Sequence, residues 1–166
     1  MQRRLGFGRY EFQVEGPIDR FDRQIVLGLF NYPTSDVGGD ATHEIDIEFA
    51  RWGQAEAPIG NFTVWPVEKA LKPTTHSFEF RLTGTGSTHR FDWSATRVLY
   101  RSVQGLRDDD GEEIRRWTFA PADADRRIAR RPMPVHLNLW LFQGRPPADL
   151  REVEVVIRSF RFVPEP

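Results

Sequence analysis

The sequence contains no cysteine, and only Lys69 and Lys72 are lysines among its 23 basic residues. Without cysteine the chain can form no disulfide, no thiolate metal site and no cysteine nucleophile. The formal net charge is −1 at pH 7, so bulk electrostatics give no reason to expect attraction to a polyanion or an anionic lipid surface. We therefore expect neither nucleic acid nor membrane as a partner.

Long apolar runs and helical periodicity are scarce as well. No stretch approaches the ~20 apolar residues needed to cross a bilayer, and residues 1–6 show no apolar region typical of a signal peptide. Only residues 123–130 could form a turn or two of helix. The 166 residues, 39% hydrophobic and 13% aromatic, nevertheless suffice for one globular domain spanning residues 1–166.

What recurs along the chain is the alternation of apolar and polar residues, at the spacing typical of β-sandwiches and barrels. The alternation predicts strands over residues 7–15, 24–32, 43–50, 61–66, 76–82, 88–93, 97–103, 115–119, 135–142 and 152–163. In the last strand the alternation slips at Arg158-Ser159, which indicates a β-bulge. We expect an all-β fold, an antiparallel β-sandwich of the jelly-roll type.

The stretch with most chemical content is His43-Glu44-Ile45-Asp46-Ile47-Glu48-Phe49. Successive side chains of a strand point to opposite faces, so Glu44, Asp46 and Glu48 share one face and the apolar residues share the other. Three carboxylates on one face repel each other and add no stability. The row indicates a ligand or a reaction, although a solvated face and a site for a hard cation such as Ca²⁺ remain open.

Glycoside hydrolysis is one reaction that uses paired carboxyl groups. Retaining enzymes hold the two groups ~5–5.5 Å apart, whereas the Cα atoms of Glu44 and Glu48 would lie about 13 Å apart on a flat strand, at ~3.3 Å per residue. The two can cooperate only if the strand is curved and the side chains lean together over a concave face. Asp46 between them can help keep one acid protonated near neutral pH, because a close carboxylate disfavours ionisation of its neighbour.

Neighbouring strands bring polar and aromatic side chains to the same face. By alternation two triplets project together: Asn61, Thr63 and Trp65, and His136, Asn138 and Trp140. Indoles stack on sugar rings while amides and imidazoles bind hydroxyls, so these residue types suit a polysaccharide cleft. A structural role remains open for each, because tryptophans that alternate with apolar residues are more often in the core. We interpret His43 and His89 as structural histidines.

Four stretches together resemble glycoside hydrolase family 16, the laminarinase, lichenase and xyloglucan transglycosylase group. Residues 43–49 resemble the family's signature, and three others occur in the family's order: Phe7-Gly8-Arg9-Tyr10-Glu11, residues 88–93 and residues 133–140. The resemblance covers nearly the whole chain. It implies a concanavalin-A-like jelly roll with the acids on its concave sheet, and retaining, endo-acting hydrolysis of β-glucans or galactans.

The resemblance also implies roles for individual residues. Glu44 would be the nucleophile, Glu48 the general acid/base and Asp46 the assisting carboxylate. The positions that would contact substrate are Asn138 and Trp140 on the late cleft strand, Asn61, Thr63 and Trp65 after the signature, His136, and the aromatics nearest before the signature, Phe30 and Tyr32. The regular Glu-x-Asp-x-Glu spacing, which lacks the extra residue of the laminarinase branch, favours mixed-linkage glucan or xyloglucan.

Further expectations follow from the same resemblance. We expect a polysaccharide partner, a monomer, an extracellular or periplasmic location, and no cofactor or metal ligand, although some family members carry a structural Ca²⁺. Residue 1 would lie several strands into the family's fold, which would leave residues 152–163 with an unprotected edge. A non-catalytic lectin-like module and a transglycosylase on the same fold are the alternative functions.

Overall fold

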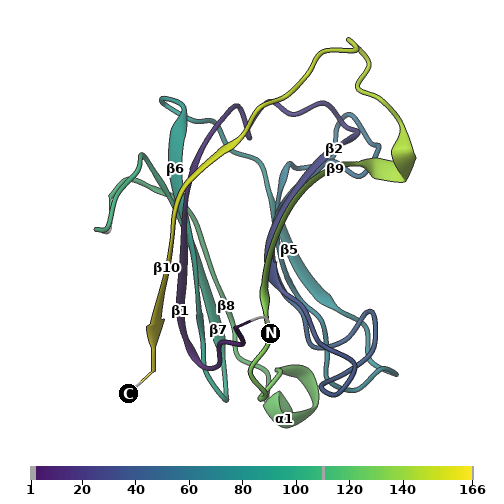
Figure 1. Ribbon diagram of the computed structural model, residues 1–166, viewed down its shortest axis with the longest axis vertical. Coiled ribbons are helices and arrows are strands. Elements are labelled where there is room, and N and C mark those ends of the chain that lie inside the picture. The colour runs from purple at the N-terminus through teal and green to yellow at the C-terminus, as the bar shows by residue number, and fades with distance from the viewer. Residues whose placement is uncertain (1–2, 110, 166) are drawn as a thin grey trace.

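The computed structural model describes residues 3–109 and 111–165. Two five-stranded antiparallel sheets face each other (Figure 1). The back sheet has the order β10-β1-β6-β7-β8, and the concave sheet has the order β5-β4-β3-β2-β9. The strands are β1 (Gly8–Glu15), β2 (Ile25–Asn31), β3 (Ile45–Phe49), β4 (Gly60–Val64), β5 (Thr74–Phe78), β6 (Gly86–Trp93), β7 (Val98–Gln104), β8 (Glu113–Phe119), β9 (Val135–Leu141) and β10 (Val156–Pro164).

Helix is limited, in the described ranges, to the short α1 (Ala124–Arg127) and the 3-10 turn η1 (Phe142–Gly144). The first confirms the turn of helix predicted over residues 123–130. No helix in these ranges is long and apolar enough to cross a membrane. The all-β sandwich expected from the alternation is therefore confirmed, and the strands of the second sheet bow so that its outer face is concave (Figure 1).

The strand predicted over residues 76–82 differs most from the observed β5, which begins two residues earlier and ends at Phe78. Beyond Phe78 the backbone bonds elsewhere, since the Leu82 N–H donates to Asp19 Oδ2 at 3.2 Å. The alternation continues through Phe80, which is buried, so the sequence pattern alone could not show where pairing stops.

The bulge predicted at Arg158-Ser159 is confirmed. Pairing between β1 and β10 passes from Gln13 opposite Ser159 to Val14 opposite Ile157, which leaves Arg158 as the extra residue. A bulge bends its strand and increases the local twist. It therefore explains why the apolar alternation changes phase within this strand.

The apolar face of the acidic strand packs into the core between the two sheets. The side chains of Ile45, Ile47 and Phe49 are completely buried, as the alternation predicts. The Phe49 ring lies 4.7 Å from that of His89, whose nitrogens bond the hydroxyls of Ser87 and Ser102 at 2.8 and 2.7 Å. Burial lowers the pKa of His89 to about 3. His89 is therefore a neutral structural histidine, as expected.

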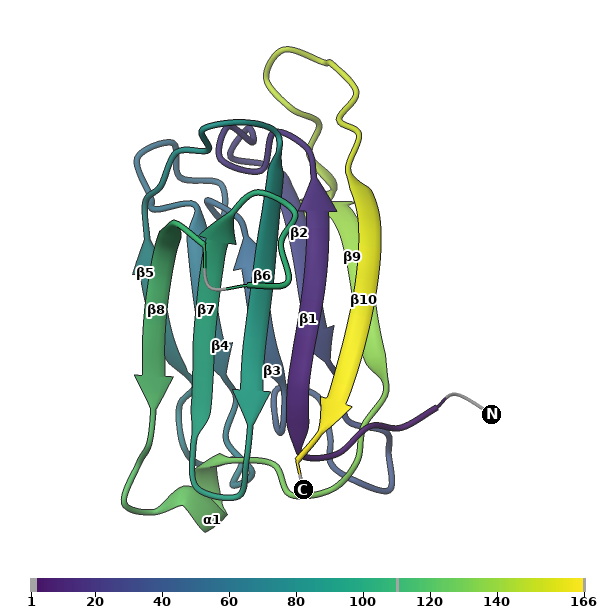
Figure 2. The same cartoon turned by 90° about the vertical axis from the view of Figure 1, so that its left-hand side faces the viewer.

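One side of the sandwich is open. Within the described chain, β9 pairs only with β2 and β10 only with β1, and the two strands form the same side of the molecule (Figure 2). The exposed large apolar side chains on these two strands are 37–45% accessible: Leu137, Leu139, Trp140, Leu141, Ile157, Phe160 and Val163. The unprotected edge expected for the last strand is thus confirmed.

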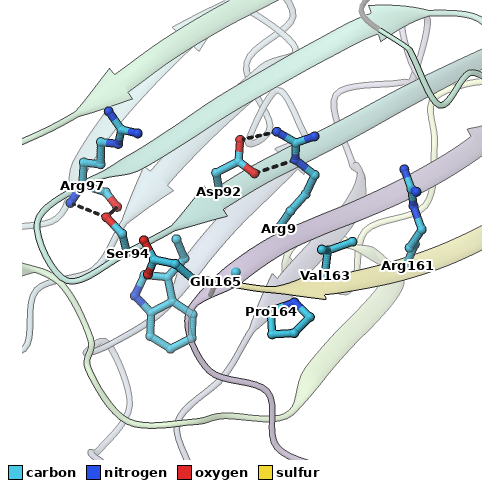
Figure 3. A pocket seen from close by; sticks show the side chains of 10 residues that line it. Arg9, Asp92, Ser94, Arg97, Arg161, Val163, Pro164 and Glu165 are labelled. Atoms are coloured by element: carbon cyan, nitrogen blue, oxygen red, sulfur yellow. Dashed lines mark hydrogen bonds and ion pairs between the residues drawn. The ribbon is translucent and has the colours of Figure 1, made fainter.

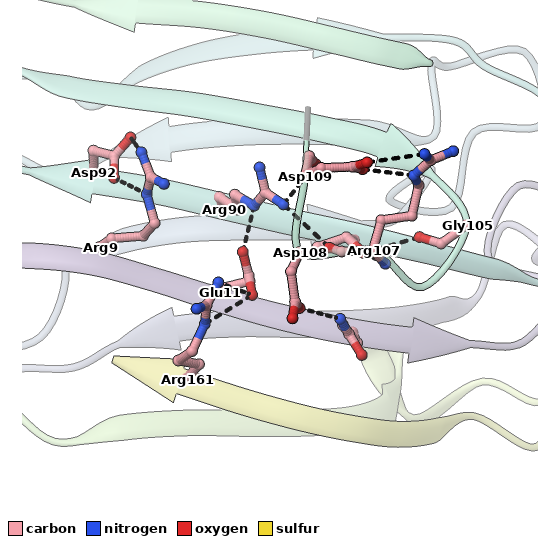
Figure 4. A network of polar contacts seen from close by, with 11 residues as sticks. Arg9, Glu11, Arg90, Asp92, Gly105, Arg107, Asp108, Asp109 and Arg161 are labelled. Carbon is pink, nitrogen blue, oxygen red and sulfur yellow. Dashed lines mark hydrogen bonds and ion pairs between the residues drawn. The ribbon is translucent and has the colours of Figure 1, made fainter. Parts of the chain in front are cut away.

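The outer face of the back sheet carries a buried ion pair (Figure 4). Arg90 Nε donates to Glu11 Oε2 at 2.5 Å, and the two side chains are only 4% and 2% exposed. Arg161 Nη2 donates to the other oxygen of Glu11 at 2.9 Å. Arg90 Nη2 also donates to the backbone carbonyls of Arg107 and Asp109, at 3.1 and 2.9 Å. The pair therefore holds the loop after β7 against the sheet.

Candidate active site

The three carboxylates lie in one cleft on the concave sheet. Asp46 and Glu48 project from β3, and Glu44 immediately precedes that strand. The Glu44 carbonyl still accepts the Trp65 backbone N–H at 2.9 Å, so the sheet continues through it. All three acids line a hollow of about 260 Å³. The alternation therefore correctly predicts which side chains share this face.

Burial sets the protonation of the acidic row. It raises the pKa of Glu44 to about 7, with the charges of Glu48 and Asp40 adding to the effect. Burial likewise raises the pKa of Glu48 to about 7. The pKa of Asp46 lies well above its usual value, first through burial and then through the neighbouring glutamates. Desolvation and like charge both favour the neutral acid, so the row retains protons near neutral pH.

Asp46 uses its two oxygens differently. Oδ2 accepts the indole N–H of Trp65 at 2.7 Å. Oδ1 is buried and has no hydrogen-bond partner among the described residues. A buried carboxyl oxygen without a partner is destabilising, and of the two oxygens of Asp46 it is the one that can carry a proton without losing a hydrogen bond.

The sequence predicts that the Asn61 side chain binds sugar hydroxyls, but in the structure its amide bonds to groups of the protein. Its amide nitrogen donates to two backbone carbonyls of the β3–β4 connection, at 3.0 and 3.2 Å, and its oxygen accepts the Ser77 hydroxyl at 2.7 Å. Both donors of the amide are therefore used inside the protein. The Thr63 hydroxyl is also hydrogen-bonded within the protein, 3.0 Å from the hydroxyl of Thr75. Alternation places these side chains correctly but does not show that their polar groups are already paired.

Three other predicted residues form an aromatic cluster beside the row. The ring of His136 lies 5.5 Å from that of Phe30 and 5.8 Å from that of Tyr32. The Tyr32 hydroxyl donates to Asp40 at 2.6 Å, and this bond raises the pKa of Tyr32 to about 12. Phe30 lies opposite both Asp46 and His136 in the sheet, so β2 brings the cluster next to the acids.

Gly28 explains how Asn138 approaches the acidic strand. It pairs with Glu48 on one side and with Asn138 on the other. A Cβ at Gly28 would lie 2.6 Å from Asn138 Oδ1 and 3.2 Å from the Phe30 ring. The missing side chain therefore leaves the space that the Asn138 amide occupies over β2.

Trp52 is the cleft residue that sequence reasoning missed. It lines the same hollow as the acids, together with Pro73 and Thr75. Its backbone is left-handed, with φ 52°, and its ring lies 6.5 Å from Trp140 and 5.7 Å from Phe142. Loops have no periodicity from which to infer a direction. The available signal is a tryptophan followed by glycine directly after the acidic strand.

A hard cation such as Ca²⁺ needs several oxygen ligands around one point. Within residues 3–109 and 111–165, no group of three or more His, Asp or Glu side chains is arranged to hold a metal ion.

A larger hollow of about 310 Å³ lies on the back sheet (Figure 3). Its polar groups are largely paired within the protein. Arg9 forms an ion pair with Asp92 at 2.7 Å, and the Ser94 hydroxyl bonds the Arg97 carbonyl at 3.1 Å. It contains no row of carboxyl groups, so the smaller cleft on the concave sheet is the stronger candidate.

No protein-family model and no curated protein matches the chain. Solved structures do match. A β-1,3-1,4-glucanase (lichenase) derived from a mouse hindgut metagenome is 20% identical, with 98% of this chain and 69% of that chain covered and a TM-score of 0.63. A β-glucanase of Bacillus licheniformis is 19% identical, with the same coverage and a TM-score of 0.65.

A family 16 endo-glucanase from Bacteroides ovatus is 13% identical over 97% of this chain and 71% of that chain, with a TM-score of 0.64. At such identities the similarity concerns the fold. It confirms the jelly roll that the motifs predict, with the acidic strand in its concave sheet. The chain therefore has the fold of the solved glycoside hydrolase family 16 enzymes.

Proposed function

We propose that this protein is a retaining endo-glycosidase that hydrolyses O-glycosyl bonds in a β-linked polysaccharide. The observation that carries the proposal is the row of three carboxyl groups in the concave cleft. The raised pKa values of Glu44 and Glu48, both about 7, allow one to be ionised while the other is protonated at neutral pH. Retention needs these two forms at once.

The two glutamates then have separate roles in the reaction. The Glu44 carboxylate attacks the anomeric carbon as the bond to the leaving oxygen breaks, and the Glu48 acid gives its proton to that oxygen. In the second step Glu48, now a carboxylate, takes a proton from water, and the water oxygen displaces Glu44 from the sugar. Asp46 adjusts the protonation of both glutamates, since it lies on the same strand face.

A non-catalytic binding module is the less favoured function, because the acidic row lowers the stability of the fold. Burying carboxyl groups beside one another opposes folding. A module that only holds a sugar through stacking and hydroxyl contacts would gain nothing from that cost. The raised pKa values are typical of groups that exchange protons during a reaction.

The substrate proposed is a β-1,4-containing glucan, either mixed-linkage glucan or xyloglucan. Aromatic side chains lie beyond both ends of the row, with Tyr32 next to the Glu44 end and Trp52 next to the Glu48 end. Rings on both sides suit a chain that extends past the cleaved bond in both directions. Among similar structures, one from Bacteroides ovatus is described with a mixed-linkage glucan product, G4G4G3G.

A panel of lichenan, laminarin, xyloglucan, agarose and carrageenan tests this function directly. We expect the wild-type protein to release oligosaccharides from lichenan or xyloglucan, and Glu44→Gln to release essentially none. A folded wild-type protein that turns over none of the five polymers but still binds one would support the lectin-like alternative. Release of longer products from two added oligosaccharides would indicate transglycosylation.

The pH dependence of kcat/KM should be bell-shaped with its maximum near pH 7. Rate falls at lower pH because the nucleophile becomes protonated, and at higher pH because the general acid loses its proton. Asp40→Asn removes a charge that raises the pKa of Glu44, so its acidic limb should move to lower pH while the alkaline limb stays. A wild-type optimum at pH 4–5 would contradict the raised pKa values.

Gly28→Ala should weaken substrate binding without unfolding the protein. The new Cβ would displace the Asn138 amide, and we expect KM to rise about tenfold, the loss of one or two hydrogen bonds. Stability should stay within ~1 kcal/mol, since alanine is at least as compatible with strand structure as glycine. Gly84→Ala is the matched control, because a Cβ there meets nothing within 4 Å. An unchanged KM would exclude Asn138 from substrate binding.

A further inference from the structure

Trp65 stands at the end of β4 with its indole in the cleft, and its residue type alone indicates a sugar-stacking platform. The structure gives it another contact. Its indole N–H donates to Asp46 Oδ2 at 2.7 Å, and its backbone N–H donates to the Glu44 carbonyl at 2.9 Å. Trp65 is therefore hydrogen-bonded to two members of the acidic row, Asp46 and Glu44.

The direction of the indole bond has a chemical consequence. An indole nitrogen donates but cannot accept, so Asp46 Oδ2 must remain an acceptor in this contact. A proton on Asp46 is then confined to Oδ1. That oxygen is completely buried, and none of the described groups bonds it. The only acids that share its strand face are Glu44 and Glu48.

We propose that Trp65 is a positioning residue that acts through Asp46, holding Oδ2 so that Oδ1 exchanges a proton with the flanking glutamates. The exchange is balanced within the row: the Oδ1–H bond of Asp46 breaks, an O–H bond forms on a glutamate, and the negative charge moves to Asp46, where the indole stabilises it. This inference rests on the proposed function, because it assigns Trp65 a part in that reaction.

Trp65→Phe is the first test, because phenylalanine keeps an aromatic face and loses the N–H. A donor to a carboxylate favours its ionised form, so without it Asp46 retains its proton to higher pH. A neutral Asp46 no longer disfavours ionisation of Glu44 and Glu48, so we expect the bell-shaped profile to move downward, by up to about one pH unit, the size of one charge-assisted hydrogen bond. We also expect kcat to fall about tenfold while KM changes less than threefold.

Trp52→Phe is the matched control, since Trp52 lines the same cleft and its ring packs near those of Trp140 and Phe142. It should raise KM and leave the pH profile in place. If Trp65→Phe behaves in the same way, with KM raised and the profile unmoved, Trp65 is a stacking platform and the proposal is wrong.

A double variant tests whether Trp65 acts through Asp46. In Asp46→Asn the group that Trp65 orients can no longer ionise, so adding Trp65→Phe should lower kcat by less than twofold further. Independent roles would give effects that multiply. Multiplying effects would overturn the proposal even if each single variant were impaired.

The indole resonance provides a readout that needs no turnover. In ¹H–¹⁵N spectra the Trp65 Nε1–H, identified by its loss in Trp65→Phe, should lie downfield in wild type and move upfield in Asp46→Asn. An identical position in both proteins would overturn the positioning role. If wild type cleaves no polysaccharide while this difference is present, the proposed function fails and the contact itself stands.

Discussion

Glu44→Gln is expected to lower kcat on lichenan or xyloglucan at least about a thousandfold, with the fold intact. A glutamine has nearly the shape of glutamate but cannot attack the anomeric carbon as an anion. The change also removes a potential buried charge from the row, so stability should stay the same or rise slightly. Steady-state release of reducing sugar, measured beside thermal unfolding, separates lost chemistry from lost structure.

Two controls make this result specific to the nucleophile. Glu56→Gln makes the same chemical change at an exposed position in the loop after β3, and its kcat should stay within about twofold of wild type. Azide added to Glu44→Ala should yield a glycosyl azide of inverted configuration, because azide attacks from the vacated side. Recovery of that product only from Glu48→Ala would exchange the two roles.

Glu11→Leu should destabilise the protein by about 3–5 kcal/mol, because it breaks the buried ion pair between Glu11 and Arg90 by removing one partner. The Arg90 side chain is 4% exposed and lies on the sheet face opposite the core. It also donates to two carbonyls of the loop after β7. Urea unfolding measures the change in free energy directly.

Asp92→Ala provides the comparison on the same face. Its ion pair with Arg9 has a similar distance of 2.7 Å, but the side chains are 33% and 47% exposed, so the loss should be below about 1 kcal/mol. The double variant Glu11→Leu/Arg90→Met should lose clearly less than the two single losses added together, since both members of the buried pair are then replaced by apolar side chains. Equal losses for Glu11→Leu and Asp92→Ala would show that burial does not matter here.

Alternation predicts much of this fold because one face of nearly every strand is buried. The period of two places Ile45, Ile47 and Phe49 in the core and the acids in the cleft. It also detects the bulge at Arg158, since one extra residue exchanges the two faces. It fails at the end of β5, where an apolar pattern continues after the backbone has changed partner.

The candidate site is less predictable because its details depend on pairing across strands. Which carbonyls the Asn61 amide reaches, and which oxygen of Asp46 accepts the Trp65 indole, are settled only when β3 and β4 are in register. The direction of the Trp52 side chain cannot be predicted from alternation, since a loop residue with a left-handed backbone belongs to no periodic face. Its direction follows instead from contacts with Trp140 and η1.

The configuration of the first product tests the central proposal most directly. ¹H NMR of a mixed-linkage oligosaccharide during the first minutes of cleavage, before mutarotation, shows which anomer is released. A glycosyl-enzyme formed on Glu44 and opened by water gives net retention, so the β-anomer should appear first and the α-anomer should grow in later. Initial release of the α-anomer would contradict the account, because it would require direct displacement by water with no covalent bond to Glu44.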